Sequence, residues 1–439
     1  MWLLPAFSAF ARNALKIFYR LTLAGERVPA RGPVLLVANH PNSLVDPAMV
    51  AAVARRPVRF LAKAPLFAMP GIGVLVKGAG AIPVYRAQDN AGPTDQNQDT
   101  FRAVWAALAE GAAVGIFPEG TSHSAPSLVP LKTGAARIAL GAAARTGGAF
   151  PILPVGLSFR DKAIFRSAAL AVVGDSVEWD DLAHAGPDDR EVVRALTARI
   201  DEALRDVTVN LERWEDEELV HAAEAIYAAE LPVDDAPDAR VTRLVEATEG
   251  LARVRAEGRA EWRRVAREVA GHARILGVLG ITPAQLHGSP RVDVAAGWTL
   301  RQLLFFGVGA PVAALGIAVY WIPYRLTGVL EQWRVKHQDV RATFKVLVGG
   351  VLHLLWTIAI AAAVGWRFGV GPALCVLVGL PLAGFVAIHV TEQWKRSVAE
   401  ARRFFLRARR RTELRELRAR QRELAAKLHA LWEELARAQ

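Results

Sequence analysis

Cysteine is almost absent from this sequence, since Cys375 is the only one among 439 residues. A single thiol excludes an intrachain disulfide and a metal cage built from cysteine ligands. A disulfide-stabilised secreted domain and a cysteine-based zinc domain are therefore both excluded. Residues 1–21 also lack the continuous apolar core and the small-residue cleavage site of a secretory signal, so we expect no cleavable signal peptide.

Acidic residues are scarce near the C-terminal end. Residues 395–439 contain 14 basic and 6 acidic side chains, so this tail carries most of the formal net charge of +11. With 52% hydrophobic residues the composition excludes a disordered chain and points to membrane contact. Because the basic excess directly follows a long apolar stretch, it indicates a juxtamembrane segment facing anionic membrane lipid, and we expect no nucleic-acid partner.

Three stretches contain no Asp, Glu, Lys or Arg, namely residues 303–324, 346–366 and 368–391. The second and third are long enough to cross about 30 Å of hydrocarbon at roughly 1.5 Å per residue. We expect them to form a transmembrane hairpin within a membrane region of residues 301–394. Basic segments flank this hairpin on both sides and favour the cytoplasm, so the first stretch, interrupted by two prolines, is expected to be re-entrant, with a full span as the alternative.

The remaining chain divides by its hydrophobic pattern. Residues 1–32 are expected to hold an amphipathic helix that packs on the next domain, lies in the membrane interface, or does both. Residues 33–186 alternate short apolar runs with helical stretches, which predicts an α/β domain with a mixed or largely parallel sheet flanked by helices. Residues 187–300 are charged with helical periodicity and predict a helical region with long helices at 211–229 and 239–269. Strands are expected at residues 34–38, 58–61, 79–84, 113–117, 152–157 and 170–173.

The tail, residues 395–439, is basic with a helical pattern. Within residues 414–435 leucines recur at alternating spacings of three and four, interrupted only by Gln421. This spacing is the seam of about three coiled-coil heptads, so it predicts a homodimer through residues 414–435 with Gln421 facing its copy. The alternative is that the leucine stripe folds back onto the helices of residues 211–269 in the same chain.

The first apolar run of the α/β domain ends just before residues 39–47, which read Asn-His-Pro-Asn-Ser-Leu-Val-Asp-Pro. His40 thus lies at the carboxyl end of a strand, where the sites of α/β folds gather. Asp46 is near enough along the chain to fold back, hold one ring nitrogen and leave the other free as a general base. Asp46 and Pro47 also fit a capped helix start, in which case His40 is an ordinary turn residue.

A second polar segment follows another apolar run. Residues 117–123 read Phe-Pro-Glu-Gly-Thr-Ser-His and place Glu119 beside backbone amides, which suits contacts with hydroxyl and phosphate groups. An ordinary loop has such a composition too. Neither Ser122 nor Ser158 lies in a Gly-x-Ser-x-Gly turn, which argues against a serine hydrolase.

Four ordered segments together resemble the glycerolipid acyltransferase family, which includes glycerol-3-phosphate and lysophosphatidic acid acyltransferases. They are the two segments above, residues 80–86 between them (Gly-Ala-Ile-Pro-Val-Tyr-Arg) and residues 153–156 after them (Leu-Pro-Val-Gly). The family pattern has four residues between His and Asp, whereas this sequence has five. With that variant and residues 204–210 (Leu-Arg-Asp-Val-Thr-Val-Asn), the chain resembles the branch of fungal-type glycerol-3-phosphate/dihydroxyacetone-phosphate acyltransferases.

The resemblance implies the family's fold and a direct acyl transfer, without a metal or a cofactor beyond the acyl donor, which is acyl-CoA or acyl-carrier protein. His40, oriented by Asp46, would take the proton of a glycerol hydroxyl. The phosphate-bearing glycerol acceptor would contact several side chains: Arg86 as phosphate clamp, Lys63 and Lys132 as further cations, Glu119, Gly120 and Thr121 at its hydroxyls, and Pro154 in the pocket wall. Each cation in isolation reads as solvated surface charge. Ser122 replaces an arginine that many relatives carry, so a phosphate contact made there is absent.

From the resemblance, the apolar stretches and the basic flanks, we expect an integral membrane enzyme of phospholipid synthesis in the bacterial inner membrane. Its catalytic domain is expected to lie in the cytoplasm. The acceptor stays open between glycerol-3-phosphate, dihydroxyacetone phosphate, lysophosphatidic acid and another lysophospholipid. The alternative from another class is a catalytically silent membrane protein that keeps the fold to bind lipid. The presence of His40, Asp46, Arg86 and Glu119 argues against that alternative.

Overall fold

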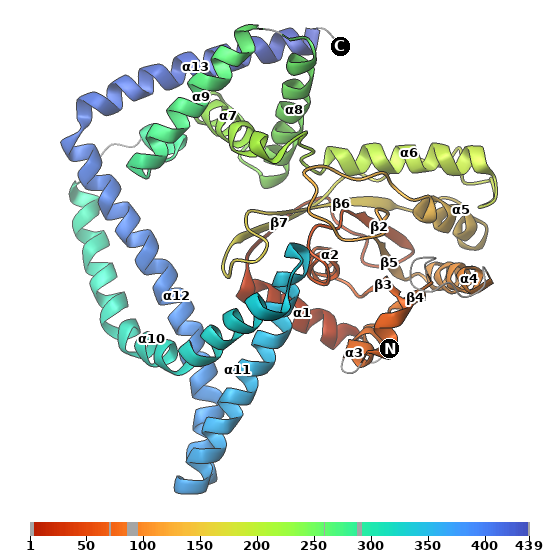
Figure 1. Cartoon of the computed structure of the whole chain (residues 1–439), viewed down its shortest axis with the longest axis horizontal. Coiled ribbons are helices and arrows are strands. Elements are labelled where there is room, and N and C mark those ends of the chain that lie inside the picture. The colour runs from red at the N-terminus through yellow and green to blue at the C-terminus, as the bar shows by residue number, and fades with distance from the viewer. Residues whose placement is uncertain (1–3, 70–71, 86–94, 259, 288–291, 438–439) are drawn as a thin grey trace. The chain divides into compact units, whose positions relative to one another are not determined.

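The computed structural model of the chain describes residues 4–69, 72–85, 95–258, 260–287 and 292–437 (Figure 1). The chain forms two compact units. The first contains Met1–Asp216, Asp234–Glu249 and His337–Thr343, and the second contains the remaining segments, Glu217–Val233, Gly250–Lys336 and Phe344–Gln439. Each unit has its own architecture.

The first unit is built around a seven-stranded sheet. Its order is β1-β7-β6-β2-β5-β3-β4, and every neighbouring pair is parallel except β6 and β7. The predicted α/β class with a mixed, largely parallel sheet is therefore confirmed. The strands are β1 (Arg20–Gly25), β2 (Val34–Ala38), β3 (Val58–Lys63), β4 (Ile82–Val84), β5 (Ala113–Ile116), β6 (Ile152–Phe159) and β7 (Ala168–Val173).

Helices cover both faces of this sheet, which explains why all five residues of the central strand β2 are buried apolar residues. One face is covered by α2 (Val45–Ala54), on which α1 (Leu4–Phe18) packs. The other face forms the main core with α4 (Asp95–Ala109), α5 (Gly134–Thr146) and α6 (Arg190–Asp206). Shorter segments are η1 (Ala64–Ala68), α3 (Ile72–Gly78) and η3 (Trp214–Asp216).

The predicted boundaries of the α/β domain, residues 33–186, are too narrow at both ends. At the N-terminal end the expected helix of residues 1–32 stops at Phe18, and the chain continues as β1 in parallel with β7. At the other end α6 contributes Val193, Leu196 and Ile200 to the core of the sheet domain. These apolar residues recur at helical spacing on one face of α6, and the other face is charged. The high charge of the segment favours a separate helical region, although its apolar face packs in the core of the sheet domain.

The second unit is helical and contains α7 (Glu217–Glu230), α9 (Ala260–Leu279) and η4 (Pro283–His287). The single helix predicted at residues 239–269 is wrong. The structure has α8 (Pro237–Ala256) and α9 instead, and Gly258 between them has a φ of +66°, a left-handed conformation that ends helices.

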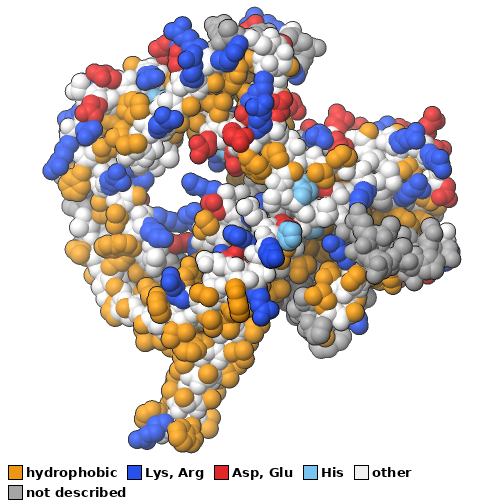
Figure 2. Space-filling view, viewed as in Figure 1, with side chains coloured by type: hydrophobic (Ala, Val, Ile, Leu, Met, Phe, Trp, Pro, Cys, Tyr) orange, Lys and Arg blue, Asp and Glu red, His pale blue; other side chains and the backbone are white. Residues whose placement is uncertain are grey.

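Among the described residues, three helices are long and apolar enough to cross a membrane: α10 (Val292–Arg334), α11 (Gln338–Phe368) and α12 (Val370–Arg409). They belong to the second unit except for the start of α11, up to Thr343, which belongs to the first. The last two are joined only through Gly369 and form the predicted hairpin. Figure 2 shows hydrophobic side chains over its surface, as lipid contact requires. The prolines expected to interrupt residues 303–324 both lie inside the continuous helix α10, which bends strongly in Figure 1.

Small residues bring these helices into close contact. A Cβ atom at Gly316 of α10 would lie 2.4 Å from the carbonyl oxygen of Ala383 in α12, and one at Gly309 would lie 3.0 Å from Val390. Toward its other end, α10 approaches the start of α11 through Lys345 and Glu331, 3.6 Å apart. Both ends of the apolar part of α10 therefore lie beside the base of the hairpin, while its middle lies deeper.

The leucine stripe of the tail lies on α13 (Arg411–Arg437) and packs within its own chain. Leu424 and Leu428 are buried against α7 and α9. Gln421 is fully buried, and its side chain contacts Glu230 at 2.6 Å and His272 at 3.2 Å. The structure thus shows the fold-back alternative, and Gln421 does not face solvent as an open dimer seam requires. The homodimer through residues 414–435 stays a prediction.

Candidate active site

Four neighbouring strands end at the same edge of the sheet. β2, β5, β3 and β4 are parallel and adjacent in that order. The register aligns Val37 of β2 with Ile116 of β5, so the loops that follow these two strands start side by side. These are the loops of His40 and Glu119, which the sequence places at strand ends. The edge has the location at which sites form in α/β folds.

The predicted pair of His40 and Asp46 is present. His40 Nδ1 and Asp46 Oδ2 are 2.8 Å apart, and the same carboxylate oxygen accepts the backbone N–H of Asn42 at 2.6 Å. Ser43, with a φ of +48°, turns the chain back so that Asp46, in the first turn of α2, reaches the imidazole. The alternative in which Asp46 caps the helix is wrong, because Leu44 occupies the cap position.

The two side chains of this pair differ in their exposure to solvent. The Asp46 side chain is fully buried, whereas that of His40 is 17% exposed. Loss of water raises the pKa of Asp46, and the hydrogen bonds from His40 and Asn42 oppose that rise in pKa. The His40 ring stacks on Phe117 with centroids 4.1 Å apart and planes 15° apart. With Nδ1 held by Asp46, Nε2 is the ring nitrogen left to exchange a proton.

Glu119 lies inside the protein. Its side chain has no exposed surface. Oε1 accepts the backbone N–H of His40 at 2.7 Å, and Oε2 accepts that of Val129 at 3.3 Å and contacts His123 Nε2. The carboxylate therefore joins three separate parts of the site rather than projecting toward solvent.

Lys132 lies over the Glu119 loop. Its backbone N–H donates to the carbonyl of Pro118 at 2.8 Å, and its side chain passes so close to Gly120 that a Cβ there would lie 2.6 Å from Nζ. Gly120 also has a φ of +75°, which favours glycine. The structure thus brings the cation of Lys132 to this loop. Thr121 is exposed beside it.

Other predicted residues lie farther along the sheet. Lys63 is the exposed last residue of β3, which neighbours β5. Pro154 is buried in β6 and aligned with Val37 of β2. Arg86 lies outside the described residues, so its phosphate contact stays a prediction.

Three contacting residues were not predicted as site residues. Asn42 donates through Nδ2 to the Tyr19 hydroxyl at 3.0 Å, and that hydroxyl donates to the carbonyl of Lys162. Burial raises the pKa of Tyr19, so the phenol stays neutral and able to donate. Asp339, which belongs to the first unit, accepts the Ser122 hydroxyl at 2.5 Å. Asn42 lies within the His40 segment and could have been found there, whereas no sequence signal marks Tyr19 or Asp339.

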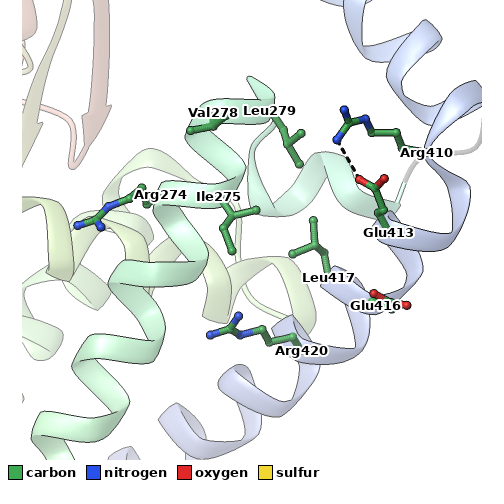
Figure 3. Close-up of a pocket in the computed structure, with 9 residues that line it drawn as sticks. All are labelled: Arg274, Ile275, Val278, Leu279, Arg410, Glu413, Glu416, Leu417 and Arg420. Atoms are coloured by element: carbon green, nitrogen blue, oxygen red, sulfur yellow. Dashed lines mark hydrogen bonds and ion pairs between the residues drawn. The ribbon is translucent and has the colours of Figure 1, made fainter.

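A cavity of about 640 Å³ lies in the second unit between α9 and the junction of α12 with α13 (Figure 3). Apolar side chains such as Ile275 and Leu417 line it, together with Arg410 and Glu413, which form an ion pair. None of its lining residues is a predicted site residue. Within the described ranges, no cluster of three or more His, Cys, Asp or Glu side chains is placed to hold a metal ion.

Comparison with known proteins agrees with the motifs. Residues 20–158 match the family model described as Acyltransferase. A stretch of 136 residues is 35% identical to glycerol-3-phosphate O-acyltransferase 2 of Saccharomyces cerevisiae, covering 30% of this chain and 18% of that protein. Another of 142 residues is 31% identical to the chloroplastic 1-acyl-sn-glycerol-3-phosphate acyltransferase BAT2 of Brassica napus, covering 32% and 38%. The chain thus matches less than half the length of either relative.

Among solved structures, the chain is similar to the 1-acyl-sn-glycerophosphate acyltransferase PlsC of Thermotoga maritima. The two are 20% identical with a TM-score of 0.35, and the alignment covers 48% of this chain and 81% of the other. The fold assignment rests on the sheet described above.

Proposed function

Since residues 20–158 match the family model described as Acyltransferase, we propose that the protein moves a fatty acyl group from acyl-CoA or acyl-carrier protein to a hydroxyl of glycerol-3-phosphate. One observation carries the proposal: the buried carboxylate of Asp46 holds His40 Nδ1 at 2.8 Å at the edge of the sheet where His40 and the Glu119 loop meet. This is the arrangement of an oriented general base.

The proposed reaction uses His40 as the base and Asp46 as its partner. His40 Nε2 removes the proton of the acceptor hydroxyl while the oxygen attacks the thioester carbonyl of the donor. Asp46 stabilises the imidazolium that forms. When the carbon–sulfur bond breaks, the imidazolium gives its proton to the leaving thiolate, so the new ester and a free thiol leave together and His40 returns to its neutral form. No acyl-enzyme is formed.

Cations along the edge would recognise the acceptor phosphate. Lys132 lies over the Gly120 turn, Lys63 ends the strand next to β5, and Arg86 would complete the clamp. Glu119, with its carboxylate turned inward, would act on the acceptor hydroxyls only indirectly, while Gly120 and Thr121 offer backbone and hydroxyl groups at the surface. A lysophosphatidic acid is the second candidate acceptor, because the Brassica napus relative is named for that kind of substrate.

The membrane arrangement belongs to the same proposal. α11 and α12 cross the membrane, and α10 enters and leaves on one side, since both ends of its apolar part lie beside the base of the hairpin. The basic flanks of the hairpin favour the cytoplasmic side of a membrane, and we propose that this side and the catalytic domain lie in the cytoplasm of a bacterial cell. With Cys375→Ala as background, an impermeant thiol reagent outside intact cells should label Arg367→Cys and spare Gln332→Cys. The reverse pattern would show three full spans.

The function is tested with the full-length protein in lipid nanodiscs. Labelled oleoyl-CoA is supplied with glycerol-3-phosphate, dihydroxyacetone phosphate, lysophosphatidic acid or uncharged glycerol, and the products are separated by chromatography. We expect turnover with a phosphate-bearing acceptor and little with glycerol. Absence of transfer to every acceptor, from oleoyl-CoA and from an acyl-carrier protein alike, would contradict the proposal.

A further inference from the structure

We propose that Glu119 and His123 are positioning residues that clamp the peptide of His40, and that neither side chain binds the acceptor. The inference rests on the proposed function for its kinetic consequence. It differs from the expectation raised by the family resemblance, in which Glu119 contacts the acceptor hydroxyls.

The backbone of His40 is held on both sides by one loop. Its N–H donates to Glu119 Oε1 at 2.7 Å, and its carbonyl oxygen accepts the backbone N–H of His123 at 3.1 Å. Asp46 and Phe117 orient the ring of His40. The two backbone contacts fix the position of the main chain from which that ring extends.

Burial keeps the Glu119 carboxylate away from a substrate. No part of the side chain is exposed, and Oε2 already accepts Val129 N–H and contacts His123 Nε2. A buried carboxylate is stable only when such donors compensate for its lost hydration. An acceptor hydroxyl could reach it only after one of these donors had been displaced.

The hydrogen bonds of His123 identify its tautomer. Nδ1 accepts the backbone N–H of Ala125 at 3.1 Å, so the ring proton lies on Nε2, where it is donated to Glu119. Both nitrogens of His123 therefore have partners within the loop, whereas His40 Nε2 has none in the part of the chain that the structure describes. The second histidine serves as a brace between Glu119 and the chain after it.

The arrangement predicts opposite results for two similar substitutions. His123→Gln places an amide where Nε2 lies and can still donate to Glu119. His123→Asn places its oxygen where Nδ1 lies, keeps the Ala125 contact and loses the donor to Glu119. Glu119→Gln replaces one carboxylate oxygen with an amide N–H₂, which faces the donors that Glu119 now accepts and so loses a hydrogen bond. The matched control is His184→Asn, the same change at an exposed position outside the site.

Steady-state kinetics with glycerol-3-phosphate and oleoyl-CoA in nanodiscs separate the two roles. For His123→Asn and Glu119→Gln we expect kcat to fall roughly 10²-fold, the effect of a catalytic group misplaced by about 1 Å, with KM for glycerol-3-phosphate within about twofold of wild type. His123→Gln should recover most of kcat. A higher KM with unchanged kcat would assign Glu119 to acceptor binding and overturn the inference.

A measurement that needs no turnover completes the test. The rate at which diethyl pyrocarbonate modifies His40, followed by mass spectrometry, should rise in His123→Asn and Glu119→Gln and stay near the wild-type rate in His123→Gln and His184→Asn. Equal rates in all variants would overturn the positioning role. If the wild-type protein transfers no acyl group, the proposed function fails, while these modification rates still decide whether His40 is clamped.

Discussion

Two histidine–carboxylate pairs occupy neighbouring loops of the sheet edge, and they differ in what the second ring nitrogen does. His40 binds Asp46 through Nδ1, its Nε2 has no hydrogen-bond partner among the described residues, and its side chain is 17% exposed. His123 contacts Glu119 through Nε2 and accepts Ala125 N–H through Nδ1. A histidine paired with a carboxylate is therefore proposed to act as a base in one loop and as a structural brace in the other, and the two rings differ in the contacts of their second nitrogen.

The first way to test this comparison is to remove the carboxylate of Asp46, the partner of His40. Asp46→Asn keeps an oxygen for Asn42 N–H but no longer stabilises an imidazolium. We expect kcat to fall by roughly 10²-fold or more, with the melting temperature retained. Radiolabelled acyl transfer measured beside differential scanning fluorimetry checks both statements, and a kcat within threefold of wild type would remove Asp46 from the mechanism.

A smaller effect is expected at Lys132, next to the braced loop. Lys132→Ala should raise KM for glycerol-3-phosphate roughly tenfold, equivalent to about 1.4 kcal/mol of lost binding, with little change in kcat. Lys132→Arg serves as the charge-retaining control. If the KM for the acyl donor rose instead, Lys132 would belong to the donor site.

Gly120→Ala tests the same loop through its backbone. A side chain there is strained by about 1–2 kcal/mol at a φ of +75° and displaces the Lys132 side chain. Because the end of a lysine moves easily, we expect a several-fold rise in the acceptor KM that resembles the effect of Lys132→Ala. Acceptor titrations of the single and double variants check this, since overlapping effects should not add.

The smallest effect concerns stability and pH. Burial raises the pKa of Asp46 above its unfolded value, so between those two values the native state binds more protons than the unfolded chain. Stability from this group is therefore full below the unfolded pKa and decreases as the pH rises through the folded pKa. Thermal melts from pH 4 to pH 8 should show a steeper decline for wild type than for Asp46→Asn. Parallel curves would argue against a raised pKa.

Much of this site could be predicted from sequence because short apolar runs end at polar segments. Buried parallel strands such as β2 and β5 are nearly all apolar, so the polar residues that follow them, His40 and Glu119, can be recognised in the sequence as candidate site residues. β1 was missed because Leu21 continues the helical apolar stripe of α1, although it already belongs to a strand. Pairing with β7 decides its conformation, and that contact is remote in sequence.

The contact between Glu119 and His123 could not be predicted either, because it also depends on contacts that are remote in sequence. Glu119 and His123 are four residues apart, a spacing that brings side chains together on a helix, but they lie in a loop. Their contact depends on the backbone of residues 120–129 and on the His40 loop from a different strand. In the tail, heptad spacing predicts a helical seam but does not distinguish a second chain from α7 and α9 of the same chain.

The most direct test of the central claim is turnover by His40→Ala in nanodiscs, with glycerol-3-phosphate and labelled oleoyl-CoA, beside wild type and His123→Gln. Loss of the general base should reduce kcat by roughly 10³-fold or more while the melting temperature stays near that of wild type, and His123→Gln should remain active. Turnover by His40→Ala at a rate close to wild type would contradict the account.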